Sequence, residues 1–505
     1  MKLLGRIFAF CMMMLTGAAA VHAAGDTLTI AVPTDVQSWD AQATNATAQT
    51  LILRSVFDPP LTQDKDLKLI PHVIKEWKWL GNDGLNMEVE LRDDVYFHNG
   101  DKLTTEDLRF SYIDRLRNES QYLRFAGVFN SAVNDIEIVS PTKAIFHLKR
   151  PWPTMPNWMG FLGQFITPKD YFLKVGREEF MKNPIGSGPY KLVSYTQGSR
   201  IVLEANDKYW GGKPAIKNLV FEIVKDPTAR VAAIQSGRVD IATGVPIREA
   251  ERLSKDPALV SSVEPTSEVL YLNAHNIGAY QDKNVRLAAY HAINKEAISK
   301  AFFAGKAPQV DVLGISSMPG YPSGLKPSYD PELSKKLLAD SGYSKEKPAK
   351  IGFYTTNGAF PNDFEVARAL VGMWAQVGIQ ADLEVLDLAK FYELSRSGGL
   401  KETALVVWAN STNDPELYIG SALNPDTTFS VWKSDDMRDI LKPLLSELDD
   451  AKRIEGYTKA EIYAQENAYI MPLLQAVTTV VRKKDLNFTW FPNTWYEPNR
   501  ISWTK

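Results

Sequence analysis

The sequence predicts an α/β protein with more than one lobe, and two observations support this. β-Branched runs alternate with stretches that carry apolar residues at helical spacing, most clearly between residues 184 and 243. The chain has 505 residues, 45% hydrophobic and 23% charged, which is enough for two or three packed lobes. It contains no internal repeat and no low-complexity linker.

Residues 184–243 show this alternation in detail. The turn Gly186–Pro189 holds two glycines, which are free to take positive φ, and a proline of fixed φ, so the chain must bend there. Residues 190–195 and 201–203 favour the two strands of a hairpin around a turn at Gly198. The elements expected next are a strand over 219–224, a helix over 228–236 that ends at Gly237, and a strand over 239–241.

Similar patterns predict elements on both sides of this stretch. Thr104 is expected to cap a helix, because acidic residues follow it in the first turn. An amphipathic helix is expected over 366–374, ended by Gly378. The strands expected elsewhere are 28–32, 379–385 and 473–481, before an aromatic tail over 488–503, and the second half of the chain is expected to begin near residues 269–273.

The first 23 residues have the pattern of a secretory signal peptide. Lys2 and Arg6 precede an apolar run over residues 7–20, and small residues suit cleavage after Ala23. The apolar run is too short to span a membrane comfortably, which argues against a permanent anchor. We therefore expect a secreted protein.

The single cysteine, Cys11, lies inside this leader. No leucine-small-small pattern precedes it, so a lipoprotein anchor is not expected. The mature chain would contain no thiol, which excludes disulfides, cysteine–zinc sites and a cysteine nucleophile. The formal net charge of the whole chain is −3. No basic patch stands out, so nucleic acid is not expected as a partner.

Four motifs follow one another in a single register. They are Pro184, Gly186-Ser187-Gly188-Pro189-Tyr190, Asn206-Asp207-Lys208-Tyr209-Trp210 and Gly237-Arg238-Val239-Asp240. In this order they resemble the bacterial peptide/nickel family of extracytoplasmic solute-binding proteins, solute-binding family 5, which serve ATP-driven importers. Segments along nearly the whole mature chain share the resemblance, among them residues 91–100, 282–296 and 329–343.

The resemblance implies a type II periplasmic-binding-protein fold, in which two lobes joined by a hinge close on a ligand. An extra α/β subdomain would be inserted in lobe I. The expected limits are lobe I over 24–57 and 183–269, the inserted subdomain over 58–182, lobe II over 270–478, and a return to lobe I over 479–505. The implied setting is the periplasm, as a monomer that delivers a small molecule to the permease subunits of an ABC transporter in the inner membrane.

Residues typical of catalysis or of metal binding are sparse. The histidines that follow the leader are scattered and never occur three or four positions apart: His72, His98, His147, His275 and His291. No nucleophile elbow, phosphate-binding loop or dinucleotide fingerprint is present. We therefore expect no enzymatic activity, no catalytic residue, no bound metal and no cofactor.

Residues 407–416 are expected to face the ligand, because they follow an apolar strand. The resemblance implies a tryptophan followed, three positions later, by an aspartate that pairs with a peptide's α-ammonium. Here these positions are Trp408 and Ser411. A serine can hydrogen-bond an ammonium but cannot neutralise it, and an unpaired charge in a desolvated cleft is costly.

A second departure concerns the ligand's carboxylate. Dipeptide-binding relatives place an arginine before the amphipathic helix, where this chain has Asn357. Neutral groups beside an aromatic face suit a sugar-like, opine-like or modified small molecule rather than a standard dipeptide. The expected ligand-binding residues are Trp408, Asn410, Ser411 and Asn357, closed from lobe I by Asn45 and Thr47.

Three alternatives stay open at this point. Trp408 is also consistent with a core position, and polar clusters before proline often only build a turn. The chain is also consistent with an oligopeptide-binding protein whose charge partners are elsewhere, for example Glu268 or Arg368. A secreted hydrolase would need a nucleophile or a carboxylate pair in the cleft.

Overall fold

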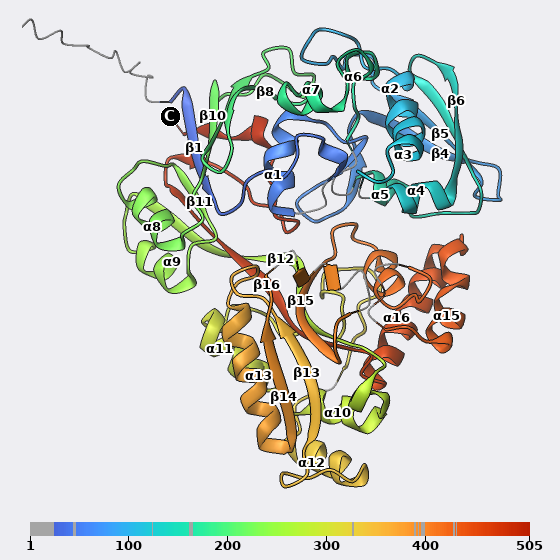
Figure 1. Cartoon of the computed structure of the whole chain (residues 1–505). Helices are drawn as coiled ribbons and strands as arrows, with labels where there is room; N and C mark the ends of the chain where they lie inside the picture. The colour runs from blue at the N-terminus through green and yellow to red at the C-terminus, as the bar shows by residue number, and fades with distance from the viewer. Residues whose placement is uncertain are drawn as a thin grey trace, which may run out of the picture.

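The computed structural model describes residues 25–43, 47–123, 125–160, 165–325, 328–387, 390–391, 393–394, 399–427, 430 and 432–504. Figure 1 shows two lobes connected by long strands, with helices packed around the sheets. A mixed ten-stranded sheet runs through both lobes in the order β14-β13-β15-β12-β16-β11-β1-β10-β9-β8. The predicted α/β class is therefore confirmed.

Lobe I is built on five strands at one end of this sheet. β1 (Thr27–Val32) lies between two parallel neighbours, β10 (Asn218–Ile223) and β11 (Ile241–Thr243). The predicted hairpin is present as β8 (Tyr190–Thr196) and β9 (Arg200–Ala205). The helices of lobe I outside the inserted subdomain are α1 (Thr47–Val56), α8 (Pro227–Gln235) and α9 (Ile247–Leu253).

The glycine turn before β8 is required for a different reason from the predicted one. Neither Gly186 nor Gly188 has a positive φ. Both lie against the end of α1, where the N–H of Gly188 donates to the carbonyl oxygen of Val56 (2.9 Å). A Cβ at residue 186 would lie 2.0 Å from that oxygen. The glycines are therefore needed because two backbones approach closely.

The inserted subdomain has its own antiparallel sheet in the order β4-β5-β7-β6. Thr104 and Asp107 form the predicted cap of α2, as a reciprocal capping box. The buried apolar residues of the subdomain and of lobe I form one continuous cluster. The elements are β4 (Ile74–Leu80), β5 (Asn86–Leu91), α2 (Thr105–Arg109), α3 (Arg115–Asn118), α4 (Ala126–Ala132), β6 (Val133–Ser140), β7 (Lys143–Leu148), α5 (Met155–Met159), α6 (Lys169–Val175) and α7 (Arg177–Lys182).

Lobe II has a separate apolar core. β13 (Ala349–Thr355) pairs in parallel with both β14 (Ile379–Val385) and β15 (Thr403–Ala409). The predicted amphipathic helix is α13 (Asp363–Val377), and Gly378 ends it with a φ of +106°. The other helices are α10 (Lys283–His291), α11 (Lys295–Phe303), α12 (Pro331–Asp340), the π-helical turn η4 (Glu416–Gly420), α15 (Asp435–Leu441) and α16 (Asp450–Glu466).

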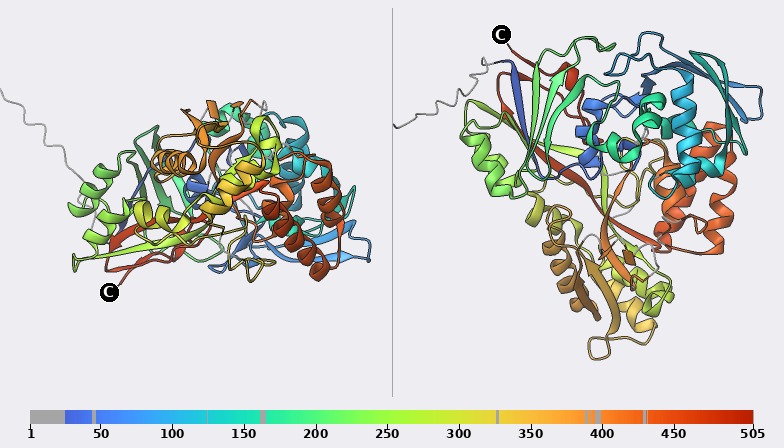
Figure 2. Two further views of the ribbon diagram at one scale, coloured as in Figure 1. Left: turned by 90° about the horizontal axis from the view of Figure 1, so that it is seen from below. Right: turned by 45° about the horizontal axis from the view of Figure 1, so that its top comes forward.

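Two long antiparallel strands join the lobes, β12 (Leu259–Ala274) and β16 (Ile470–Lys483). The second part of β12 pairs with β15 of lobe II, whereas the end of β16 pairs with β11 of lobe I. Their register shifts between Pro265 and Val269. The right view in Figure 2 shows long strands passing between the two lobes. The bulge therefore marks where the lobes meet.

None of the helices in the described ranges is long and apolar enough to cross a membrane. The predicted leader, residues 1–23, lies outside the described residues. The residue limits given above for the lobes and the subdomain stay predictions.

Candidate functional site

The loop that follows β15 begins at the junction of the two lobes. The N–H of Asn410 donates to the carbonyl oxygen of Ser267 (3.0 Å), within the bulge of β12. The N–H of Ser267 donates in turn to the carbonyl oxygen of Pro492 (2.7 Å), in the C-terminal segment. Three parts of the chain that are distant in sequence therefore meet at the first residue of the predicted ligand loop.

This junction contains several buried polar atoms without a hydrogen-bond partner in the described part of the chain. They are Trp408 Nε1, Asn410 Oδ1, Ser411 Oγ and Ser267 Oγ. Asn410, Ser411 and Ser267 are each 0% exposed. Buried polar groups without partners are uncommon because each loses its hydration. The grouping indicates a surface that uncharged donors and acceptors of a ligand would satisfy.

Trp408 lies at the border of the lobe II core. Its ring packs edge-to-face against Tyr271, with ring centroids 6.4 Å apart, and it borders the core of lobe II. The side chain is nevertheless only partly buried. The indole therefore has a packed face and an unpaired N–H.

Asn410 is fixed by the interior of lobe II. Its side-chain amide donates to the carbonyl oxygen of Leu313 (2.8 Å). The neighbouring Gly314 N–H donates to Glu461 (3.0 Å), and burial raises the pKa of that carboxyl to about 8. The NH₂ group of the Asn410 side chain is thus bonded to the protein itself, whereas its oxygen accepts no hydrogen bond from the described residues.

The acidic residue that follows in the loop is already neutralised. Arg453 donates to both oxygens of Asp414, at 2.7 and 2.8 Å, and both side chains are less than 10% exposed. Such a bidentate pair holds both charges in a fixed geometry. Asp414 is therefore a structural anchor of the loop and not a free partner for a cationic ligand.

The inserted subdomain contacts the same loop from the other side. The Trp152 indole N–H donates to Glu416 Oε1 (3.2 Å), and the Thr154 hydroxyl donates to Glu416 Oε2. The Asn157 amide donates to the carbonyl oxygen of Thr412 (3.1 Å). Figure 1 shows α5 above the part of lobe II that contains α15 and α16. Residues 410–416 are thus held from both lobes.

Asn357 is not buried with this group. It is exposed, in the turn after β13, and this turn is folded around the carboxylate of Asp363. Because β13 and β15 are parallel neighbours, their carboxyl ends lie at the same edge of the sheet. Asn357 therefore shares an edge with Ser411, without being brought into contact with it.

The structure places the other predicted site residues, and the two charge partners considered, in different positions relative to this loop. Asn45 lies outside the described residues, and Thr47 is the first residue of α1, with no description of its side chain. Glu268 lies directly opposite Ala409 in the pairing of β12 with β15, next to the loop. Arg368 is exposed on α13 and lies over the ring of Phe364. Of the two charge partners considered, only Glu268 lies beside the candidate site.

The sequence analysis missed several residues of this site. Ser267 is in the bulge of β12, Pro492 is in the C-terminal segment, and Trp152, Thr154 and Asn157 belong to the subdomain. No local pattern marks them, because each contact joins segments far apart in the chain. Trp152 and Glu416, for example, are 264 positions apart.

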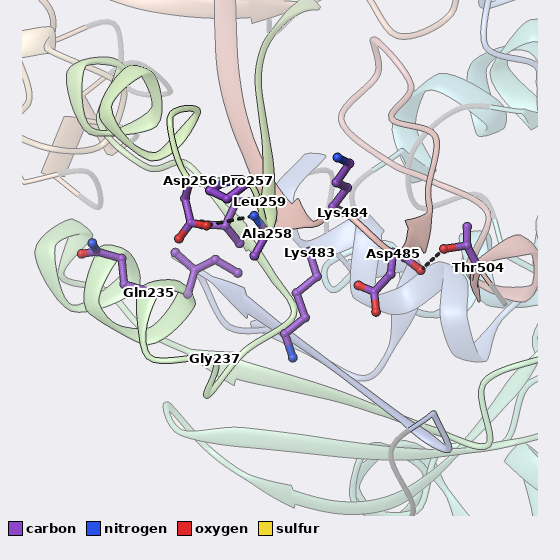
Figure 3. A pocket seen from close by; sticks show the side chains of 11 residues that line it. Gln235, Gly237, Asp256, Pro257, Ala258, Leu259, Lys483, Lys484, Asp485 and Thr504 are labelled. Carbon is purple, nitrogen blue, oxygen red and sulfur yellow. Dashed lines mark hydrogen bonds between the residues drawn. The ribbon is translucent and has the colours of Figure 1, made fainter.

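Two hollows lie outside this grouping. A hollow of about 700 Å³ lies at the lobe I end of β16, and its lining includes Asp256, Lys483 and Thr504. Figure 3 shows these side chains from close by. None of the predicted site residues lines this hollow. A small apolar hollow of about 10 Å³ lies beside Val407 and Phe360. No group of three or more metal-binding side chains occurs in the described ranges.

Comparison with known proteins gives a consistent family assignment. Residues 68–430 match the family described as bacterial extracellular solute-binding proteins, family 5. A dipeptide-binding protein of Escherichia coli (strain K12) is 27% identical over 79% of this chain and 80% of its own length. A glutathione-binding protein, GsiB, of Shigella flexneri serotype 5b is 25% identical over 94% of each chain.

Solved structures show the same architecture. The periplasmic binding protein DppA from Helicobacter pylori, in complex with the peptide STSA, has a TM-score of 0.83 at 23% identity, covering 95% of this chain and 98% of its own. MoaA from A. tumefacien R10, in complex with mannopinic acid, has a TM-score of 0.81 at 22% identity, covering 95% and 100%. The predicted type II periplasmic-binding-protein fold is thereby confirmed.

Proposed function

Since the chain belongs to family 5 of the bacterial extracellular solute-binding proteins, we propose that it captures a small solute by lobe closure and delivers it to an ABC permease. Binding on both lobes favours the closed form, since a ligand shifts a population toward the state that it contacts more. The proposed setting is the periplasm, reached through a leader cleaved after Ala23, with the protein acting as a monomer. Substrate binding without conversion is the activity expected of it.

The proposed ligand is not a standard dipeptide. The observation that carries this proposal is the fully buried hydroxyl of Ser411, which has no hydrogen-bond partner in the described part of the chain. The family resemblance implies an aspartate at this position in peptide-binding relatives. The acid that follows it, Asp414, is neutralised by Arg453. With Trp408 and Asn410 alongside, the site favours a ligand that presents hydroxyl or amide groups to lobe II, such as a sugar-like or opine-like compound.

An oligopeptide ligand is the second candidate, and the position of Glu268 favours it. Glu268 lies opposite Ala409 in the strand pairing, beside the loop, and is partly exposed. A peptide ammonium that reached this position would meet a negative charge of the kind that Ser411 does not supply. The similarity to the E. coli dipeptide-binding protein is consistent with this second candidate.

Isothermal titration calorimetry with a defined panel would test the proposal. The panel should contain a dipeptide, an oligopeptide, glutathione, an opine and an oligosaccharide, and mass spectrometry should follow each bound compound. We expect micromolar binding of an uncharged or weakly charged compound, recovered unchanged. Tight dipeptide binding would contradict the ligand proposal, and turnover of a bound compound would favour the hydrolase alternative.

Ser411→Asp provides a direct prediction for the ligand class. The new carboxylate would be buried beside Asp414 and Glu416 without a cation, so the ligand-free protein should lose stability. A peptide's α-ammonium would supply that cation, so we expect peptide affinity to rise by about tenfold or more. Calorimetry with the same dipeptide and oligopeptide measures the change.

Ser411→Asn is the matched control for this prediction. Asparagine has nearly the same size as aspartate and can hydrogen-bond an ammonium, but it has no charge. It should therefore not produce the peptide gain. Equal peptide affinities for the two variants would show that residue 411 does not face the ligand's amino group.

A further inference from the structure

The contact between Glu416 and the inserted subdomain joins the two lobes beside the candidate site. Glu416 starts η4 in lobe II, whereas Trp152 and Thr154 lie just before α5 in the subdomain. Each oxygen of the Glu416 carboxyl accepts a hydrogen bond from one of these two residues. Opening the lobes would have to break both bonds.

The two residues that donate to Glu416 are buried and packed in the subdomain. Trp152 is 0% exposed and packs edge-to-face on Phe129, with ring centroids 5.2 Å apart. Thr154 is 2% exposed. The side-chain amide of Asn157, in the same helix region, donates to the backbone carbonyl oxygen of Thr412 in the loop. The subdomain thus directs three hydrogen-bond donors at residues 412–416.

We propose that Glu416 is a positioning residue, which fastens the ligand loop to the inserted subdomain when the lobes close. This inference rests on the proposed function of capture by closure. Asn410 is fixed at one end of the loop by Leu313 and Ser267. Glu416 fixes the other end, so Ser411 is held at a defined place between them.

The electrostatic surroundings of Glu416 make this fastening sensitive to pH. Burial is the main influence and, with the nearby charge of Asp414, raises the pKa of Glu416 from its ordinary 4.5 to about 7. Arg150 of the subdomain, Arg453 of α16 and the hydrogen bond from Trp152 lower the pKa of Glu416 but do not cancel this rise. Tyr457 of α16 also senses the Glu416 charge: burial first, and then the charges of Glu416 and Asp414, raise the pKa of that tyrosine.

The direction of the pH effect follows from proton linkage. In an open form the carboxyl would be hydrated, with a pKa near its ordinary value, so the closed form binds more protons. The contribution of Glu416 to closure is therefore complete below pH 4.5 and is lost as the pH rises through about 7. A merely structural contact without titration would produce no such profile.

Single-molecule fluorescence energy transfer on the ligand-free protein would test this inference. The only cysteine is Cys11 in the leader, so labels can be attached at Glu137→Cys in the subdomain and Lys459→Cys on α16, both at exposed positions. We expect the ratio of closed to open molecules to fall about 30-fold from about pH 5.5 to about pH 8.5.

Glu416→Gln should remove this dependence. An amide can accept from Trp152 and donate to Thr154, so it imitates the protonated acid and should keep the ratio near its low-pH value throughout. Glu466→Gln, the same change at an exposed position of α16, should keep the wild-type profile. Trp152→Phe retains the ring but loses the donor, and should lower the closed fraction at low pH.

Three results would overturn the inference: a closed fraction too small to detect, a wild-type ratio that is constant with pH, or a Glu416→Gln variant that titrates like the wild type. Circular dichroism would verify that each variant is folded. The measurement requires no ligand. A ligand panel without any binding would therefore contradict the proposed function while leaving this result intact.

Discussion

Gly186→Ala is expected to lower the free energy of unfolding by about 3 kcal/mol or more. The new Cβ would lie 2.0 Å from the carbonyl oxygen of Val56 and 2.8 Å from the ring of Phe57. Val56 cannot easily withdraw, because its oxygen accepts the hydrogen bond from Gly188 that holds the turn against α1. Relief would require moving the turn and α1 apart.

Urea denaturation followed by circular dichroism would measure this loss. Gly127→Ala is the matched control, because a Cβ at that exposed position of α4 would meet nothing within 4 Å and its φ is not positive. The control should be neutral or slightly stabilising, since alanine favours helix more than glycine does. Equal stability of the two variants would show that the close approach at Val56 is not a constraint.

Arg453→Met is expected to destabilise the protein by about 3–5 kcal/mol at neutral pH, because it leaves Asp414 as an uncompensated buried charge. The pair is nearly inaccessible, with exposed side-chain fractions of 4% for Arg453 and 8% for Asp414. Methionine fills much of the same volume, so the loss would report the charge and not a cavity. Urea denaturation at pH 7 measures it directly.

The double variant Arg453→Met/Asp414→Asn separates charge from packing. Asparagine removes the unpaired charge and can still accept the hydrogen bond that Asp414 receives from the N–H of Glu416 (3.0 Å). We therefore expect the double variant to recover much of the lost stability. A single variant within about 1 kcal/mol of the wild type would contradict a tightly buried pair.

Much of the secondary structure could be predicted from local patterns. The hairpin of β8 and β9 follows from two strand-like runs around Gly198, and α13 ends at the glycine expected to stop it. The hinge strands were underestimated, since the strand expected over 473–481 is only part of β16 and the full length of β12 was not predicted. The first part of β12 pairs with β16, far along the chain, and a local pattern does not specify that pairing.

The candidate site could be predicted only in part. The motif around Trp408 and Ser411 predicts a ligand loop, and the structure places this loop at the junction of the lobes. The turn with Asn357 reaches the same edge of the sheet, but its side chain is exposed. The polar surroundings of Ser411 depend on Ser267 and on the subdomain, which are more than one hundred positions away.

By itself, the sequence determined the α/β class and the hairpin and helix order, and it predicted the loop in which a neutral serine would replace a charged residue. These features depend on residue periodicity, turn chemistry and motif spacing within a few tens of positions. Only the tertiary structure decided that Asp414 is neutralised, that Glu416 is enclosed between two lobes, and that the turn glycines are required by Val56. Burial and pairing of this kind depend on segments that meet only when the whole chain has packed.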